Sequence, residues 1–300
     1  MSRFRVKRRR EDSGNKNQLQ EVPEENVGIR INGFFGMFDI LGFQSLIKNS
    51  TLDQLVELYR SVLSGIEREA ITLKYTDEEQ TLSLDKVGSF MFSDTIILYQ
   101  EHPVSGLPVG GSFILKAALL LRLAFEKGIP LRGAISYGDY YVERNCFIGR
   151  PIVEAYEIEK SQDWSGAVLC PSAGGEYERD LKNRKSTKRI DFHGIEINPA
   201  ELLSPFMNNL IIECDVPTKE GPNRKQALCW DDYVPMFCGI NVPKLVPENL
   251  TERVHASFSD HNKDISNREV QKKIKNTISF LRFSSKRVIK TRLVSRGDHP

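Results

Sequence analysis

The sequence contains few cysteines and no long apolar run, which argues against a disulfide-stabilised protein and against a membrane-spanning one. Its five cysteines are an odd set without a C-x-x-C pair, so we expect reduced thiols and neither a disulfide framework nor a zinc site. Lys116 and Arg122 interrupt the most apolar stretch, which leaves no segment long enough to span a bilayer. The basic residues of Met1–Arg10 are followed by no apolar segment of the signal-peptide kind. We therefore expect a cytoplasmic protein.

The residues that are present have the balance of a soluble globular chain. The 300 residues are 40% hydrophobic and 27% charged, which excludes wholesale disorder, collagen-like repeats and disulfide-rich mini-folds. A chain of this length can bury a substantial core. We expect a disordered basic arm at 1–26, a main domain at 27–240 with its core at 31–170, and a basic, partly helical C-terminal extension at 241–300.

The net charge of +2 conceals two strongly basic ends. Six of the first ten residues are Lys or Arg, and residues 263–300 carry eleven basic residues against three acidic ones. Either end could contact nucleic acid or an anionic membrane surface. Alternatively, the N-terminal end is only a solvated arm and the C-terminal end only the solvated face of a helix. A nucleic-acid-binding protein that uses these termini is therefore one hypothesis, and steep salt dependence of binding would identify it.

Apolar periodicity up to residue 147 predicts strands that alternate with helices. The resulting β-α-β-β-α-β order is that of an α+β, ferredoxin-like sheet with helices on one face. Gly128 and Pro130 stand where they would end the second helix. The expected elements are a strand at 27–38, a helix whose stripe runs from Leu52 to Ala70, a hairpin of strands at 87–92 and 95–99, a helix at 112–127, a strand at 131–137 and a segment at 140–147 that pairs back on it.

The same topology places two aspartates side by side. The first strand of a ferredoxin-like sheet lies between the third and the fourth, so Asp39 at its end comes close to Asp94 in the hairpin turn. Two converging carboxylates supply the hard oxygen ligands that hold Mg²⁺ or Mn²⁺ in phosphate chemistry. Taken singly, Asp39 could instead cap the following helix, and Asp94 could be only a turn residue.

The chain beyond Gly149 is expected to add further elements to this sheet. Pro151 lies in the first turn of a short predicted helix, and no internal repeat is present. The other expected features are a strand at 167–170, a polar surface insertion at 176–189, a strand pair at 210–216 and 226–230, and a C-terminal helix with Val270, Ile274, Ile278 and Leu281 on one face.

Four motifs stand in the order found in class III nucleotide cyclases. The segment FDILGF at 38–43 resembles the family's F-x-D-I-x-G-F, and MFSDTII at 91–97 resembles the hairpin of its second metal-binding Asp. LRGAISYG at 131–138 is similar to L-R-x-G-I-x-x-G, and IGRPIVEAYEIE at 148–159 falls where the family has G-x-x-V-N-x-A-x-R. The resemblance covers residues 33–170, under half of the chain. It implies a class III cyclase catalytic core within 27–240, followed by the C-terminal extension.

This resemblance implies a site for two Mn²⁺ or Mg²⁺ ions, held by Asp39, Asp94 and Ile40. The ions would activate the ribose 3′-hydroxyl and hold the leaving pyrophosphate. Backbone groups around Asp39 would bind the triphosphate. This nucleotide-binding set consists of Phe38, Ile40, Leu41, Gly42 and Phe43.

The sequence departs from the family pattern at several positions. Ser93 replaces the glycine before the second Asp, and Val153 and Glu157 replace the Asn and Arg that steady the ribose and the transition-state phosphate. Arg150 or Arg144 could supply that positive charge, and we expect Arg150 to be catalytic. The alternative is a catalytically inactive cyclase fold that serves as a nucleotide-binding or scaffold module.

The positions that read the base also differ from those of purine cyclases. Phe90 and Cys146 stand where adenylyl cyclases place a Lys and an Asp, and the Glu that accompanies such a Cys in guanylyl cyclases is missing. Phe90 could equally be a strand core residue. The combination is most similar to the bacterial pyrimidine cyclases of Pycsar type, which make cyclic CMP or cyclic UMP in anti-phage defence. It implies CTP or UTP as substrate, a homodimer in which 144–156 approaches the partner's aspartates, and a separate effector protein that responds to the cyclic nucleotide.

Overall fold

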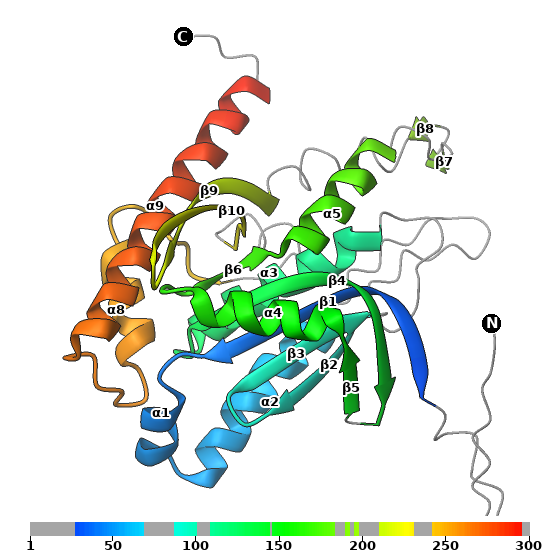
Figure 1. Ribbon diagram of the computed structural model, residues 1–300. Coiled ribbons are helices and arrows are strands. Elements are labelled where there is room, and N and C mark those ends of the chain that lie inside the picture. Colours follow the sequence, from blue (N-terminus) through cyan, green and yellow to red (C-terminus); the bar gives the residue numbers. More distant parts are fainter. Residues whose placement is uncertain are drawn as a thin grey trace, which may run out of the picture.

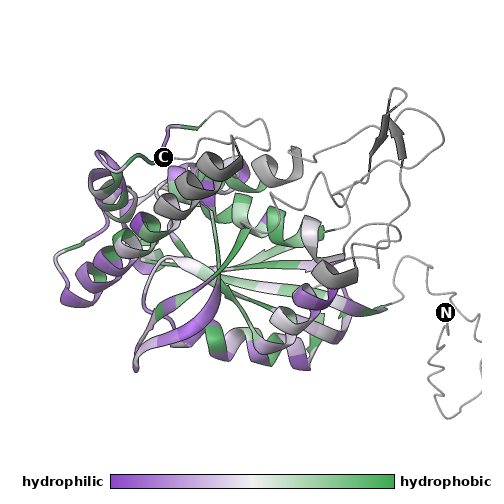
Figure 2. Cartoon of the chain, turned by 90° about the horizontal axis from the view of Figure 1, so that it is seen from above, coloured by the Kyte–Doolittle hydropathy of each residue, from purple (hydrophilic) through white to green (hydrophobic). Residues whose placement is uncertain are grey.

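A twisted β-sheet with helices on both faces organises the chain (Figure 1). The structure is a computed structural model that describes residues 28–68, 87–100, 109–144, 146–183, 190–192, 195–197, 210–230 and 242–295. The arm expected at 1–26 lies outside these residues. Viewed from above, the strands fan around a common centre, and the helices carry their hydrophilic residues on the outside (Figure 2).

The first half of the described chain has the predicted α+β, β-α-β-β-α-β order. Its strands lie in the order β2-β3-β1-β4, so the first strand lies between the third and the fourth as expected. The short helix α1 was not predicted. The elements are β1 (Ile29–Ile40), α1 (Phe43–Asn49), α2 (Leu52–Arg68), β2 (Val87–Phe92), β3 (Thr95–Gln100), α3 (Val109–Glu126) and β4 (Leu131–Glu143).

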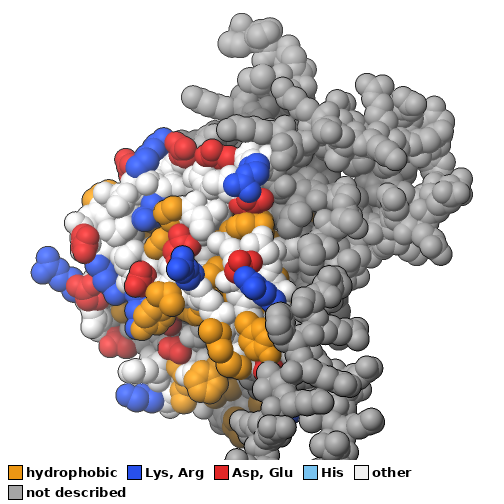
Figure 3. Space-filling view, turned by 45° about the vertical axis from the view of Figure 1, so that its right-hand side comes forward, with side chains coloured by type: hydrophobic (Ala, Val, Ile, Leu, Met, Phe, Trp, Pro, Cys, Tyr) orange, Lys and Arg blue, Asp and Glu red, His pale blue; other side chains and the backbone are white. Residues whose placement is uncertain are grey.

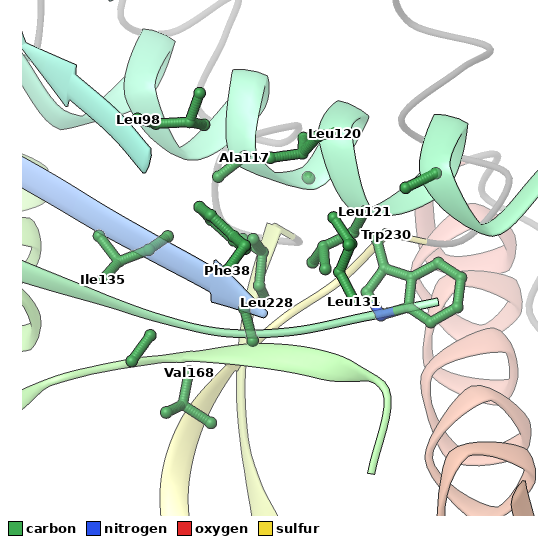
Figure 4. Packing of buried hydrophobic residues seen from close by; sticks show 14 of the residues in the cluster. Phe38, Leu98, Ala117, Leu120, Leu121, Leu131, Ile135, Val168, Leu228 and Trp230 are labelled. Carbon is green, nitrogen blue, oxygen red and sulfur yellow. The ribbon is translucent and has the colours of Figure 1, made fainter. Parts of the chain in front are cut away.

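One face of this sheet is packed against α3, which in turn contacts α2. Side chains alternate between the two faces of a strand, and Phe34 and Phe38 of β1 both point to the α3 side. The ring of Phe34 stacks on Phe113 of α3 at a centroid distance of 5.7 Å. Phe38 is fully buried and lies between the sheet and Ala117 of α3 (Figure 4). The two helices of the motif therefore share one face, as predicted.

The opposite face of β1 and β4 is covered by the helix that follows the motif. Strand β5 (Cys146–Gly149) pairs back on β4, and α4 (Arg150–Ser161) then packs on β4 and β1. Pro151 lies in the first turn of α4, as expected. The expected strand at 140–147 was wrong in its extent, because residues 140–143 continue β4 without a break. Only the short β5 pairs back, and Arg144 in the turn has a positive φ of 54°.

Later strands widen the same sheet in the order β4-β6-β10-β9. The predicted strands near 167–170, 210–216 and 226–230 are confirmed with shifted ends. The polar insertion expected at 176–189 is wrong for residues 176–183, because these belong to a helix that buries Ala173 and Tyr177. The elements are β6 (Gly166–Leu169), α5 (Pro171–Asn183), β9 (Ile211–Thr218) and β10 (Gly221–Leu228), with β7 (Ile190–Phe192) and β8 (Ile195–Ile197) as a separate pair.

The C-terminal segment packs on the same core through α8 (Leu250–Ser259) and α9 (Arg268–Ser295). Phe280 of α9 meets Trp164 edge-on at a centroid distance of 4.4 Å, and Thr277 Oγ1 accepts a hydrogen bond from Ser165 N–H at 2.9 Å. The predicted apolar face of α9 is buried at Ile274, Ile278 and Leu281. No helix within the described residues is long and apolar enough to cross a bilayer.

Candidate metal and nucleotide site

Asp39 and Asp94 lie at the same end of two neighbouring strands. Asp39 of β1 pairs with Thr95 of β3, and Asp94 is the residue before Thr95 in the β2–β3 turn. The Ile40 N–H donates a hydrogen bond to the Asp94 carbonyl at 2.8 Å, which ties the turn to the strand end. Ser93 occupies this turn with a left-handed φ of 57°, a conformation that glycine adopts with less strain than serine does. The structure thus brings the two predicted metal aspartates together.

An arginine and a glutamate that the sequence analysis did not single out complete this end of the sheet. Arg132 of β4 is the cross-strand partner of Asp39, and its Nη2 lies 3.2 Å from Asp39 Oδ2. The Arg132 Nε donates to Glu159 Oε1 in the last turn of α4 at 2.5 Å. The side chains of Asp39, Arg132 and Glu159 are 26%, 10% and 4% exposed, respectively. Asp39 is therefore the member of this trio that remains open to solvent and ligands.

The electrostatic environment of Asp39 reflects burial and a second carboxylate. Burial raises the pKa of Asp39, the Arg132 guanidinium opposes that rise, and the charge of Asp94 adds to it. Among the described residues no group of three or more His, Cys, Asp or Glu side chains could hold a metal ion. The donor set is therefore the pair Asp39 and Asp94, whose hard oxygens suit Mg²⁺ or Mn²⁺ and whose mutual repulsion a divalent cation would relieve.

The backbone amides after Asp39 differ in their availability. The N–H of Ile40 donates to Asp94, and the N–H of Leu41 donates to the Pro130 carbonyl at 2.9 Å. Gly42 has a left-handed φ of 80° and directly precedes α1, whose first-turn N–H groups have no acceptor within the helix. Of the predicted phosphate-binding segment, Gly42 and Phe43 thus offer the better-placed amides. Phe38 is a core residue, because its side chain is completely buried.

Two lysines add positive charge around Asp39. Lys160 lies in the last turn of α4, and Lys219 lies in the β9–β10 turn, where its N–H donates to the Ser161 carbonyl at 2.9 Å. Both side chains are close enough to lower the pKa of Asp39. The sequence analysis missed Lys219 because a turn between two strands carries no signal for the distant residue that it meets.

A third lysine, Lys263, lies beneath the Gly42 turn. Its ammonium group is buried and donates hydrogen bonds to the Gly128 carbonyl and, at 3.0 Å, to the Ser257 carbonyl. Burial lowers the pKa of Lys263 to about 8. A Cβ on Gly42 would lie only 3.2 Å from Lys263 Cδ, so the C-terminal segment directly supports this turn.

The remaining predicted residues are Phe90, Cys146 and Arg150, and Arg150 lies away from the aspartates of its own chain. Phe90 of β2 is half-buried, and its ring lies 5.7 Å from that of Phe147, next to exposed Cys146. Arg150 is exposed at the first residue of α4, whereas Glu159 lies in the last turn. Nine residues of helix correspond to roughly 13 Å, so Arg150 is far from its own Asp39. Phe90 thus contacts the strand neighbour of Cys146 and not Cys146 itself, and Arg150 is not brought to the metal pair.

No protein-family model and no curated protein matches the sequence. Among solved structures the chain is similar to the guanylyl cyclase Cya2, with 9% identity, 67% of this chain and 92% of that chain covered, and a TM-score of 0.39. The catalytic core of a rhodopsin-guanylyl cyclase with converted specificity, in complex with ATPαS, has 10% identity, coverages of 67% and 97%, and a TM-score of 0.41. A class III adenylyl cyclase-like ATP-binding protein from Pseudomonas aeruginosa has 14% identity, coverages of 54% and 38%, and a TM-score of 0.38.

Proposed function

We propose that the chain is a metal-dependent nucleotide cyclase that converts CTP or UTP to the 3′,5′-cyclic monophosphate and pyrophosphate. The observation that supports this most is the placement of Asp39 and Asp94 at adjacent strand ends, within the motifs that resemble class III cyclases. The product would act in the cytoplasm as a messenger for a separate effector protein in bacterial anti-phage defence. That role rests on the resemblance of the motifs to pyrimidine cyclases.

In this proposal Asp39 and Asp94, with the Ile40 backbone, hold two Mn²⁺ or Mg²⁺ ions. Bound divalent ions would supply the positive charge that in-line attack on the α-phosphorus requires. Arg132 restrains Asp39 by holding one of its carboxylate oxygens. Lys160 and Lys219 add positive charge on the side where a triphosphate would lie, and the amides of Gly42 and Phe43 would donate hydrogen bonds to its oxygens.

We further propose a head-to-tail homodimer that places Arg150 of one chain near the aspartates of the other. Exposed apolar side chains lie on the elements that would form the contact: Phe92 at the end of β2, Ile148 on β5, and Val153 and Tyr156 on α4. Hydrophobic side chains gather between charged ones on the side of the molecule seen in Figure 3. A second copy that packs on β2, β5 and α4 would cover these four side chains.

Complementation tests this assembly. A chain with Asp39→Ala and a chain with Arg150→Ala should each be inactive alone and partly active when mixed, because one composite site is then intact. No recovery of activity, in a mixture whose dimer is confirmed by light scattering, would show that Arg150 acts within its own chain.

Base choice tests the proposed substrate. Phe90 and Cys146 offer apolar bulk where purine cyclases place polar groups, and a buried base edge without a partner is discriminated against. Purified protein with Mn²⁺ and equal concentrations of the four nucleoside triphosphates should therefore yield mainly cyclic CMP or cyclic UMP on chromatography. Dominant cyclic AMP or cyclic GMP would overturn the pyrimidine assignment alone. The absence of any cyclic product would overturn the cyclase proposal and favour an inactive nucleotide-binding fold.

A further inference from the structure

The most buried ionic contact beside the aspartates joins Arg132 to Glu159. Glu159 is 4% exposed, although it lies in the last turn of a surface helix whose neighbouring residues Glu157 and Lys160 are exposed. Glutamate is rarely buried to this extent without a partner, and here the partner is Arg132 at 2.5 Å. The position of this carboxylate therefore calls for a role that its surface neighbours do not have.

Arg132 is held from three directions. Its Nε donates to Glu159, its Nη1 donates to the Gln162 carbonyl at 3.2 Å, and its Nη2 donates to Asp39 at 3.2 Å. The planar guanidinium group presents its donors in a rigid fork, so fixing two of them fixes the third. Glu159 and the end of α4 thereby determine where Arg132 meets the carboxylate of Asp39.

The charges of the trio decide what this arrangement does to a cation. Asp39 and Glu159 carry two negative charges against the one positive charge of Arg132, so the trio has a net charge of −1 when all are ionised. Without the charge of Glu159 the trio would be neutral, and the full charge of Arg132 would act on any cation bound by Asp39. The repulsion between Arg132 and such a cation is stronger where the side chains are shielded from water.

We infer that Glu159 is a positioning residue for the metal site: it anchors and neutralises Arg132, so that Asp39 keeps its affinity for a divalent cation. This inference rests on the proposed function, because it assumes that Asp39 and Asp94 bind Mn²⁺. Outer partners of metal ligands typically change metal affinity by about 10- to 100-fold when they are removed.

Mn²⁺ binding to the full chain, followed by the electron paramagnetic resonance of free Mn²⁺, tests this role without any turnover. Glu159→Gln keeps the shape and an acceptor oxygen for Arg132 but removes the charge. Glu157→Gln is the matched control, because it removes the same charge from an exposed position on the same helix. We expect Glu159→Gln to weaken Mn²⁺ binding by about 10- to 100-fold and Glu157→Gln to leave it nearly unchanged.

The double variant Glu159→Gln with Arg132→Gln separates positioning from packing. It restores the net charge of −1 and leaves no unpaired buried charge, so it should regain much of the Mn²⁺ affinity that Glu159→Gln loses. A residue that only packs α4 on the sheet would make the double variant the worse of the two. Should the single variant fail to fold by circular dichroism, Arg132→Gln replaces it in the comparison. This variant keeps the charge of Glu159, so it should bind Mn²⁺ more tightly than the double variant, and equal affinities would overturn the inference.

Three outcomes decide between the proposals. Normal Mn²⁺ binding by folded Glu159→Gln would overturn the role of Glu159 and leave the proposed function standing. Failure of the double variant to bind better than Glu159→Gln would do the same. Wild-type Mn²⁺ binding that Asp39→Asn and Asp94→Asn do not reduce would overturn the metal site itself, and the inference with it.

Discussion

The two faces of β1 differ most sharply at its end, where neighbouring residues have opposite surroundings. Phe38 is completely buried against α3, whereas Asp39 points to the face that carries Arg132, Glu159 and the end of α4. At this end of the strand the first face packs against the buried apolar side chains of α3 (Figure 4). The second carries ion pairs between side chains of β1, β4 and α4, so the comparison separates the apolar core from the site that we propose performs the chemistry.

The largest expected effect is on the charged face. Asp39→Ala or Asp94→Ala should reduce cyclic nucleotide production by more than about a hundredfold, since a metal ligand contributes more than its outer partners do. The fold should persist, because neither side chain is part of the apolar core. Product formation measures the loss of activity, and circular dichroism checks that the fold persists. Near-normal turnover in either variant would show that the pair does not bind the catalytic metal.

The apolar face should show the reverse pattern. Phe38→Ala should lower the free energy of unfolding by about 3–5 kcal/mol, because it leaves a cavity beneath α3. Met37→Ala, at the neighbouring position on the other, partly exposed face, should cost clearly less. Urea denaturation of both variants measures the difference. Equal losses would mean that the two faces contribute alike to stability.

Some features of the site could be predicted from the sequence, whereas the side-chain contacts that complete it could not. The β2–β3 hairpin and the meeting of Asp39 with Asp94 follow from strand patterning and the ferredoxin-like order. The pairing of Asp39 with Arg132 depends on strand register, and the contact with Glu159 depends on how α4 packs. Arg132 and Glu159 lay inside the recognised motifs, but nothing in their spacing showed that they meet.

The missed and misread helices have physical reasons as well. Helix α1 has seven residues and buries only Leu46, which is too short a pattern for a 3.6-residue period to be visible. Helix α5 buries Ala173 and Tyr177 within a polar segment, so it has no wide apolar stripe. The support of the Gly42 turn by Lys263 joins residues far apart in the chain and has no local signature.

A smaller effect is expected at Lys263, whose buried ammonium group lies beneath the Gly42 turn, next to the proposed site. Its pKa is about 8 in the folded protein and near the ordinary 10.5 when unfolded, so between these values the unfolded chain binds more protons. The contribution of Lys263 to stability should therefore rise by up to about 3 kcal/mol as the pH increases from 8 to 10.5. Urea unfolding of the wild type and of Lys263→Met at several pH values measures this contribution. A difference independent of pH would contradict the depressed pKa.

The smallest expected effect on stability is at Gly133, where strand β4 packs closely against Phe38 of β1. A Cβ on Gly133 would lie 2.3 Å from Cδ1 of Phe38 and 3.0 Å from the Met37 carbonyl. Gly133→Ala should cost about 1–3 kcal/mol through overpacking. It should also reduce activity, because Gly133 adjoins Arg132 on β4. Thermal unfolding and turnover of this variant check both, and an unchanged stability would show that the strands can separate to accept the methyl group.

The location of Mn²⁺ tests the central claim most directly. Anomalous scattering from crystals of the full chain with Mn²⁺ and a non-cyclisable CTP analogue would locate the ion independently of any assay. The account predicts Mn²⁺ within coordinating distance of the carboxylates of both Asp39 and Asp94. Nucleotide bound with no Mn²⁺ at these two side chains, and with the Asp39–Arg132 ion pair intact, would contradict it.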